Sequence, residues 1–129
     1  MSNDIKHVIV VRKDLNLTKG KLATYVAHVS IQFLLENNES DRGDEFTIKL
    51  NPEEAVWLRE SAFSTIYAIN SAEALQNMML RAELDGIEVY PLFVQTPKEF
   101  DGDRTLVCAA FGPASSNDLS KILGKLKLI

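Results

Sequence analysis

Short apolar runs alternate along this chain with longer stretches of mixed polarity. The run Val8 to Val11, inside Lys6 to Arg12, is too short for a helix and too apolar for a half-exposed strand. It therefore predicts a central strand that is covered on both faces. Three further strands are predicted by segments rich in β-branched and aromatic residues: Ser64 to Asn70, Val89 to Val94 and Thr105 to Phe111.

Helices are predicted between these strands. Thr18 can cap a helix that runs to about Leu35, because apolar residues recur along it at helical spacing. Its buried face is expected to contain Leu22, Val26, Val29 and Phe33, flanked by Ala23, Ala27, Ile31 and Leu34. Three more helices are predicted from capping residues: 51–61, 71–86 and one that begins at about Asn117. In the second of these, which Ser71 caps, the residues expected to point inward are Leu75, Met78, Met79 and Ala82.

The order of these elements predicts the fold class. Strands interleaved with helices give a layered α/β sheet. The third and fourth strands lie only about ten residues apart, which is too short for a parallel crossover, so the sheet should be mixed. Phe46 to Leu50 alternates in polarity and predicts a short edge strand or extended segment. At 129 residues the chain has room for one domain, residues 1–129.

Composition excludes several classes of protein. The chain is 46% hydrophobic and 25% charged, as in globular domains and unlike disordered or fibrous chains. The uncharged stretch Leu22 to Leu35 is far shorter than the ~20 residues of a membrane span, and the polar start does not resemble a signal peptide. We therefore expect a cytoplasmic protein without a membrane partner. A single cysteine, Cys108, excludes an internal disulfide, and its apolar neighbours predict a buried strand position.

Positive charge is concentrated near the start of the chain. The net charge is −4, yet residues 1–35 hold five basic and two acidic residues, whereas residues 36–62 hold three basic and eight acidic residues. This asymmetry is compatible with a basic binding site on an acidic protein and also with a solvated lysine-rich face.

Generic catalytic motifs are missing from the sequence. It has no glycine-rich phosphate loop and no nucleophile-elbow serine. Its two histidines, His7 and His28, are too few for a histidine-rich metal site, so we expect no bound metal.

The segment Thr18 to His28 contains the candidate chemistry. On a helix that starts here, Lys21, Tyr25 and His28 are spaced i, i+4, i+7 and share one face, with Lys19 at the helix entrance. The lysines, the backbone amides and the positive helix end would together attract a phosphate. Solvated lysines and a histidine bonded to a nearby carbonyl would give the same pattern, so helix geometry leaves both interpretations open.

Two long motifs resemble the archaeal and eukaryotic type of peptidyl-tRNA hydrolase, the second structural class of that activity. The first is Val8 to His28, which contains Lys-Gly-Lys at 19–21. The second is Phe111-Gly112-Pro113 with Asn117-Asp118-Leu119 and the closing Leu123-Gly124-Lys125-Leu126-Lys127-Leu128. The resemblance covers roughly residues 6–35 and 57–129, and Asn37 to Leu50 resembles a variant or inserted connection.

This resemblance implies a three-layer α/β/α fold with a mixed four-stranded sheet. It also implies a homodimer that hydrolyses the ester between a peptide and the 3′ ribose of tRNA, without a metal or organic cofactor. The first lysine of the family's Lys-Gly-Lys motif is catalytic and matches Lys19, and the family's helix histidine matches His28. Lys21, and Tyr25 in place of the family's glutamine, are then expected to bind the substrate.

The chain departs from the family pattern after the third strand. The family has an aspartate there, within Asp-Ala-Gly, followed by two threonines. Counting back from Gly112-Pro113 places these three residues at Gln95, Glu99 and Val107, none of which matches. Gln95 can orient a water by hydrogen bonds but cannot act as a base. A two-residue shift of the loop brings Thr105 towards the last threonine, so Gln95 and Thr105 are expected to contact substrate.

Two functions from different classes follow from these observations. The first is a peptidyl-tRNA hydrolase of the second type, or a relative with weakened activity on an acylated tRNA end. The second is a non-catalytic domain of the same fold that binds RNA or a protein partner. The intact first motif favours the hydrolase, whereas the altered hydrolytic set around Gln95 favours the binding domain.

Overall fold

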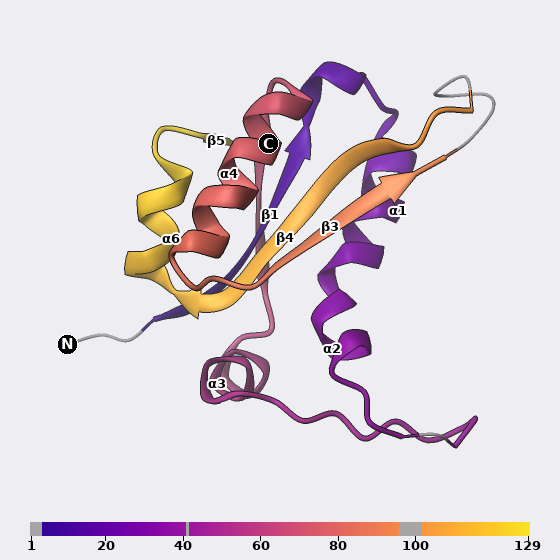
Figure 1. The fold of residues 1–129 in the computed structure, drawn as a ribbon, viewed down its shortest axis with the longest axis vertical. Helices are drawn as coiled ribbons and strands as arrows, with labels where there is room; N and C mark the ends of the chain where they lie inside the picture. The colour runs from indigo at the N-terminus through magenta and orange to yellow at the C-terminus, as the bar shows by residue number, and fades with distance from the viewer. Residues whose placement is uncertain (1–3, 41, 96–101) are drawn as a thin grey trace.

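The computed structural model describes residues 4–40, 42–95 and 102–129 and has the expected α/β fold (Figure 1). The strands are β1 (Ile5–Arg12), β2 (Ser64–Ile69), β3 (Val89–Val94), β4 (Thr105–Ser115) and β5 (Lys127–Leu128). The helices are η1 (Lys13–Leu15), α1 (Lys19–Ser30), α2 (Gln32–Glu36), α3 (Pro52–Glu60), α4 (Ala72–Leu84) and α6 (Ser116–Leu123). Within the described ranges, none of these helices is long and apolar enough to cross a membrane.

The five strands form one mixed sheet in the order β3-β4-β1-β2-β5. β1 is parallel to β2 and antiparallel to β4, and β3 is antiparallel to β4, as their short connection requires. The expected count of four strands is one too few, because Lys127 and Leu128 pair with Ala68 and Tyr67 at the edge. A two-residue strand has no alternating pattern of its own, so the sequence gives no signal for it.

Helices cover both faces of the sheet, which confirms the three-layer arrangement. Figure 1 shows α4 and α6 on one side of the sheet and α1 on the other. The core beneath α4 and α6 includes Val8, Val10, Leu75, Phe111 and Leu119. The core beneath α1, α2 and α3 includes Ile9, Val11, Val29, Phe33 and Trp57. The apolar run of β1 therefore supplies both cores, since successive strand residues point to opposite faces.

The first predicted helix is in fact two helices, α1 and α2. Thr18 is the N-cap, as predicted, and its hydroxyl oxygen accepts a hydrogen bond from the Lys21 amide at 3.3 Å. At the other end the Ser30 hydroxyl donates to the Ala27 carbonyl at 2.8 Å, a contact that commonly bends helices. The next residue, Ile31, lies between α1 and α2 and is 47% exposed. The expectation of one continuous helix was therefore wrong. The predicted apolar stripe does face the core, because Val29 and Phe33 are buried and Leu22 and Val26 pack against them, whereas the flanking Ala23, Ala27 and Ile31 are exposed.

The connection before α3 contains no regular strand among its described residues. Phe46 to Leu50 was expected to be an edge strand or extended segment, and only Ile48 makes an isolated bridge, with Asn38. The helix that follows begins as predicted, with Asn51 and Glu54 forming reciprocal side-chain to backbone hydrogen bonds.

Strand β4 is longer than predicted. It continues beyond Phe111 to Ser115, through a glycine that was expected to close it. Gly112 has φ of 92°, and a Cβ atom there would lie 2.7 Å from the Ala114 nitrogen. Only glycine adopts this backbone without strain, so Gly112 allows the strand to continue where the sequence suggested a turn.

Candidate functional site

Arg12, at the end of β1, fixes the segment that leads into α1. Its Nε and Nη2 donate to the two carboxylate oxygens of Asp14 at 3.1 and 2.6 Å, and its Nη1 donates to the Leu106 carbonyl on β4 at 3.0 Å. The hydrogen bond from Arg12 is the main cause that holds the pKa of Asp14 below its ordinary value. Because a bidentate pair has a defined geometry, the entrance to α1 is held against the start of β4.

The first turn of α1 is basic. Lys19 and Lys21 are both exposed, and this turn contains no acidic residue. The amides of a first helical turn lack intrahelical partners and give that end a partial positive charge. The start of α1 therefore combines two ammonium groups with a positive helix end, which favours an anionic ligand.

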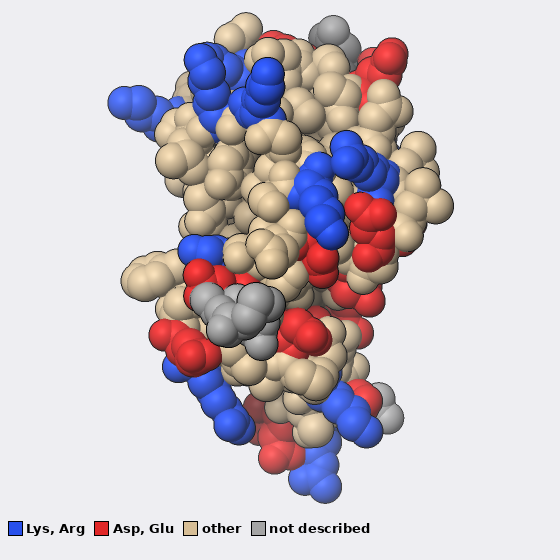
Figure 2. Space-filling model, turned by 90° about the vertical axis from the view of Figure 1, so that its left-hand side faces the viewer, with Lys and Arg blue, Asp and Glu red and all other residues tan. Residues whose placement is uncertain are grey.

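Charge is unevenly distributed over the surface. Figure 2 shows Lys and Arg side chains gathered at the upper end of the face in view, the end at which Figure 1 places η1 and the start of α1. Over the middle and lower parts of that face, Asp and Glu side chains are interspersed with Lys and Arg. A positive end on a chain of net charge −4 is compatible with binding to RNA phosphates.

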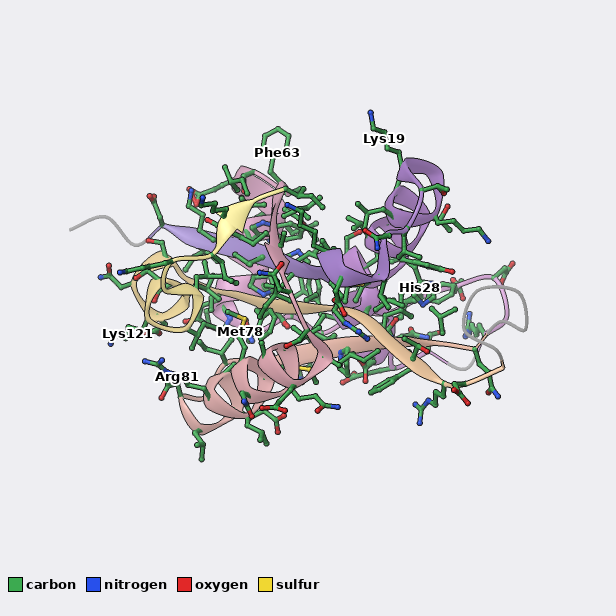
Figure 3. The ribbon with its side chains drawn as sticks, turned by 90° about the horizontal axis from the view of Figure 1, so that it is seen from above. Lys19, His28, Phe63, Met78, Arg81 and Lys121 are labelled. Carbon is green, nitrogen blue, oxygen red and sulfur yellow. The ribbon has the colours of Figure 1, made fainter. Side chains whose placement is uncertain are left out.

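The candidate residues of α1 lie on two flanks of the helix. Lys21, Tyr25 and His28 share one flank; Lys21 and His28 are exposed, and Tyr25 packs partly against the core beneath α1. Lys19 precedes His28 by nine positions, which corresponds to about 180° of rotation and roughly 13 Å along the axis. In Figure 3 the two side chains point in different directions. The structure therefore does not bring Lys19 and His28 together.

Gln95 and Thr105 lie at the loop end of the β3–β4 hairpin, where the two strands are connected. Thr105 pairs with Val94, which directly precedes Gln95. The Gln95 side-chain amide donates to the Gly102 carbonyl at 2.6 Å, and the Thr105 hydroxyl donates to the Asp103 carbonyl at 3.2 Å. Both side chains thus hydrogen-bond to the backbone of the connection between the two strands.

This end of the hairpin adjoins the flank formed by Lys21, Tyr25 and His28. α1 packs against β3 and β4, and Tyr25 belongs to the same apolar cluster as Val94. Of the other positions that the family pattern pointed to, Val107 is buried in β4, and Glu99 lies outside the described residues.

A buried histidine is the feature that the sequence argument missed. His7 is 1% exposed, its Nδ1 lies 2.6 Å from the Ser64 hydroxyl, and its ring centroid lies 5.0 Å from that of Trp57 and 5.5 Å from that of Phe33. Its buried Nε2 has no hydrogen-bond partner within the described part of the chain. Burial lowers the pKa of His7 to about 4, so the ring is neutral at pH 7. The sequence did contain a signal for this burial, because His7 lies two positions before Ile9 on the predicted central strand and therefore shares its face.

Cys108 is buried in β4, as predicted, and burial raises the pKa of its thiol to about 12. A thiol with that pKa is not a nucleophile near neutral pH. Within residues 4–40, 42–95 and 102–129, no group of three or more His, Cys, Asp or Glu side chains could hold a metal ion. The groups that the candidate site offers are the ammonium, phenol, imidazole and amide groups described above.

Comparison with known proteins shows similarity along nearly the whole chain. The family described as "Peptidyl-tRNA hydrolase PTH2" matches residues 5–129. The chain is 32% identical over 126 residues to the peptidyl-tRNA hydrolase of Nanoarchaeum equitans, a match that covers 96% of this chain and 98% of that protein. It is 31% identical over 127 residues to the peptidyl-tRNA hydrolase of Saccharolobus solfataricus, covering 97% and 99%. The corresponding protein of Metallosphaera sedula is 26% identical over 125 residues, covering 97% and 100%.

Proposed function

The chain belongs to the peptidyl-tRNA hydrolase PTH2 family, and we propose that it hydrolyses the ester joining a peptide to the 3′ end of tRNA. The observation that supports this most strongly is the family match over residues 5–129, which includes both motifs of the sequence. In the reaction, water adds to the ester carbonyl, the bond to the ribose oxygen breaks, and that oxygen takes up a proton. The products are a peptide with a free carboxylate and a tRNA with a free hydroxyl. The non-catalytic alternative is not favoured.

Such hydrolysis needs a positioned water, donors for the developing oxyanion and a proton for the ribose oxygen. We propose that Lys19 contacts the ester and stabilises the developing oxyanion, because its ammonium group lies at the positive end of α1. His28 lies roughly 13 Å further along the helix. We therefore assign His28 to contacts with the bound RNA rather than to the ester atoms that Lys19 contacts.

The tRNA strand would follow the other flank of α1. Lys21 and His28 are exposed on that flank and can contact phosphates, with Tyr25 between them. Gln95 and Thr105 lie at the adjoining hairpin end and offer an amide and a hydroxyl for the ribose or a bound water. The ester would then lie over the start of α1, with the RNA on the side of the β3–β4 hairpin.

The direct test is a deacylation assay with purified protein and an N-acetylated aminoacyl-tRNA. We expect release of the acyl group above the uncatalysed rate, with no added metal or organic cofactor. Tight binding of the same tRNA without release would contradict the hydrolase and support a binding domain. If the protein neither releases the acyl group nor binds the tRNA, its function must use another surface of the molecule.

We also propose that the protein acts in the cytoplasm as a homodimer. Leu80 and Leu84, one helical turn apart on α4, are 61% and 87% exposed and offer an apolar surface that a second copy could cover. Sedimentation of the wild type is expected to give twice the mass of one chain, and Leu84→Glu is expected to reduce it. A monomeric wild type at micromolar concentration would contradict the dimer.

A further inference from the structure

An open groove lies beside α1 on the flank opposite Lys21 and His28. It has a volume of about 370 Å³ and is bounded by α1, by β2 and by the end of the chain. Its lining residues are Lys19, Leu22, Ala23, Val26, Ala27, Ile66 and Ile129. The hydrophobic pattern predicted that Ala23 and Ala27 flank a buried helix face, but both residues are exposed.

The position of α1 over the sheet explains why the groove is open. α1 packs mainly against β1, β3 and β4, so its outer flank stands beside β2 rather than on it. The inner side of the groove is Ile66 of β2, which is only partly buried and accepts a hydrogen bond from the Ile129 amide at 3.1 Å through its carbonyl. The Ile66 side chain is thus left partly available to a ligand.

The chemistry of the walls selects one kind of ligand. The walls are almost wholly apolar, so Lys19 contributes its methylene stem to them, and Figure 3 shows its amine extended away from the body of the molecule. A nucleobase buried here would leave its donors and acceptors without partners, which costs free energy. An aliphatic or aromatic side chain would have no such cost, and the volume suits one or two of them.

We propose that this groove holds an apolar side chain of the peptide part of the substrate. The inference rests on the proposed hydrolase function and on the assignment of Lys19 to the ester. Lys19 joins the groove to the proposed position of the ester, because its stem lines the groove while its ammonium group extends outward at the start of α1. The substrate would therefore straddle the start of α1, with its peptide on the Lys19 flank and its RNA on the Lys21 flank.

The groove predicts a preference for apolar peptides. N-acetyl-leucyl-tRNA and N-acetyl-glycyl-tRNA differ by a side chain that only the first can place in the groove. We expect wild-type kcat/KM to be at least about tenfold higher for the leucyl substrate, the size of effect that a hydrophobic pocket gives. Ala23→Phe should fill the groove and bring the ratio close to one, with the glycyl substrate still cleaved.

A matched control is available on the same helix. Thr24 is exposed, neighbours Ala23 and does not line the groove, so Thr24→Phe should keep the wild-type ratio. A binding measurement without turnover uses amide-linked N-acetyl-leucyl and N-acetyl-glycyl analogues of the terminal adenosine. The leucyl analogue should bind wild type more tightly and lose that advantage in Ala23→Phe.

Three results would overturn the proposal. The first is a leucyl to glycyl ratio near one in the wild type, in both cleavage and binding. The second is an equal change of the ratio in Ala23→Phe and Thr24→Phe. The third is a change of molecular mass in Ala23→Phe with the ratio retained, which would assign the groove to contact with a second copy. Binding preference without any cleavage would support the groove and contradict the hydrolase, so the two proposals fail separately.

Discussion

The two helical layers of this protein differ in how regularly they are built. The α4–α6 layer follows the hydrophobic pattern closely: of the four α4 residues predicted to point inward, Leu75, Met78 and Ala82 are buried and Met79 is partly buried against the same core. The α1–α3 layer departs from it, with a helix break at Ile31, exposed alanines on α1 and a buried histidine on the sheet beneath. Local rules of folding are most often broken where a protein has a function. The candidate chemistry accordingly lies on the irregular layer.

The largest expected effects test whether both layers belong to one cooperative core. Phe33 and Leu75 are fully buried on opposite faces of the sheet. We expect Phe33→Ala and Leu75→Ala to lower the free energy of unfolding by about 3–5 and 2–5 kcal/mol, because each leaves a cavity. Urea denaturation measures both. Phe46→Ala is the matched control, since Phe46 is 62% exposed and its truncation should change stability by less than about 0.5 kcal/mol.

A loss below about 1 kcal/mol for Phe33→Ala would break the comparison. It would show that the irregular layer is only loosely attached to the sheet, so that the geometry around α1 could not hold a site.

The next effect separates the two histidines. Burial lowers the pKa of His7 in the folded state to about 4, below the ordinary histidine value of 6.5. Between these two pH values the unfolded chain therefore binds more protons than the folded chain. The contribution of neutral His7 to stability is fully present above pH 6.5 and is lost as the pH falls towards 4. Between pH 7 and pH 4.5 this should cost wild type roughly 2–3 kcal/mol that His7→Phe does not lose.

Urea denaturation of both proteins at the two pH values measures this difference. His28→Ala, at an exposed position, should keep the wild-type pH dependence. An equal loss in wild type and His7→Phe would mean that His7 is not held neutral in the core.

A smaller effect is expected at the altered hydrolytic position. Gln95→Asp introduces a carboxylate at the end of β3, where it could activate a water. General-base assistance typically raises a rate by ~10²–10⁴. We expect a smaller rise in kcat, of at least about tenfold, because Asp cannot make the hydrogen bond that Gln95 donates to the Gly102 carbonyl. Gln95→Asn is the matched neutral control and should not raise kcat. The idea fails if both variants change kcat alike.

The accuracy of the sequence argument followed the same division between layers. For α4, the cap Ser71 and the inward residues were predicted because the signals are local and agree with one another. For α1, helical spacing alone placed Lys21, Tyr25 and His28 on one flank. The same spacing implies that Lys19 lies on the other flank, a consequence that the family resemblance obscured.

What the sequence could not supply depends on contacts between distant segments. The groove beside α1 exists because the chain end pairs with β2 and places Ile129 next to Ile66. The Gln95 contact with Gly102 depends on the path of a loop that has no periodic pattern. The break between α1 and α2 at Ile31 has no counterpart in the hydrophobic pattern, which continues at helical spacing from Val29 to Phe33.

The most direct test of the central claim, that the chemistry lies at the start of α1, compares one lysine from each layer. Lys19 begins α1, whereas Lys121 is an exposed lysine of α6 across the sheet. In single-turnover cleavage of an N-acetylated aminoacyl-tRNA, we expect Lys19→Ala to lower the rate by ~10² or more, the usual loss when an oxyanion donor is removed. Lys121→Ala should stay within about twofold of wild type, as expected for a surface charge away from the site. Equal rates for the two variants would contradict the account.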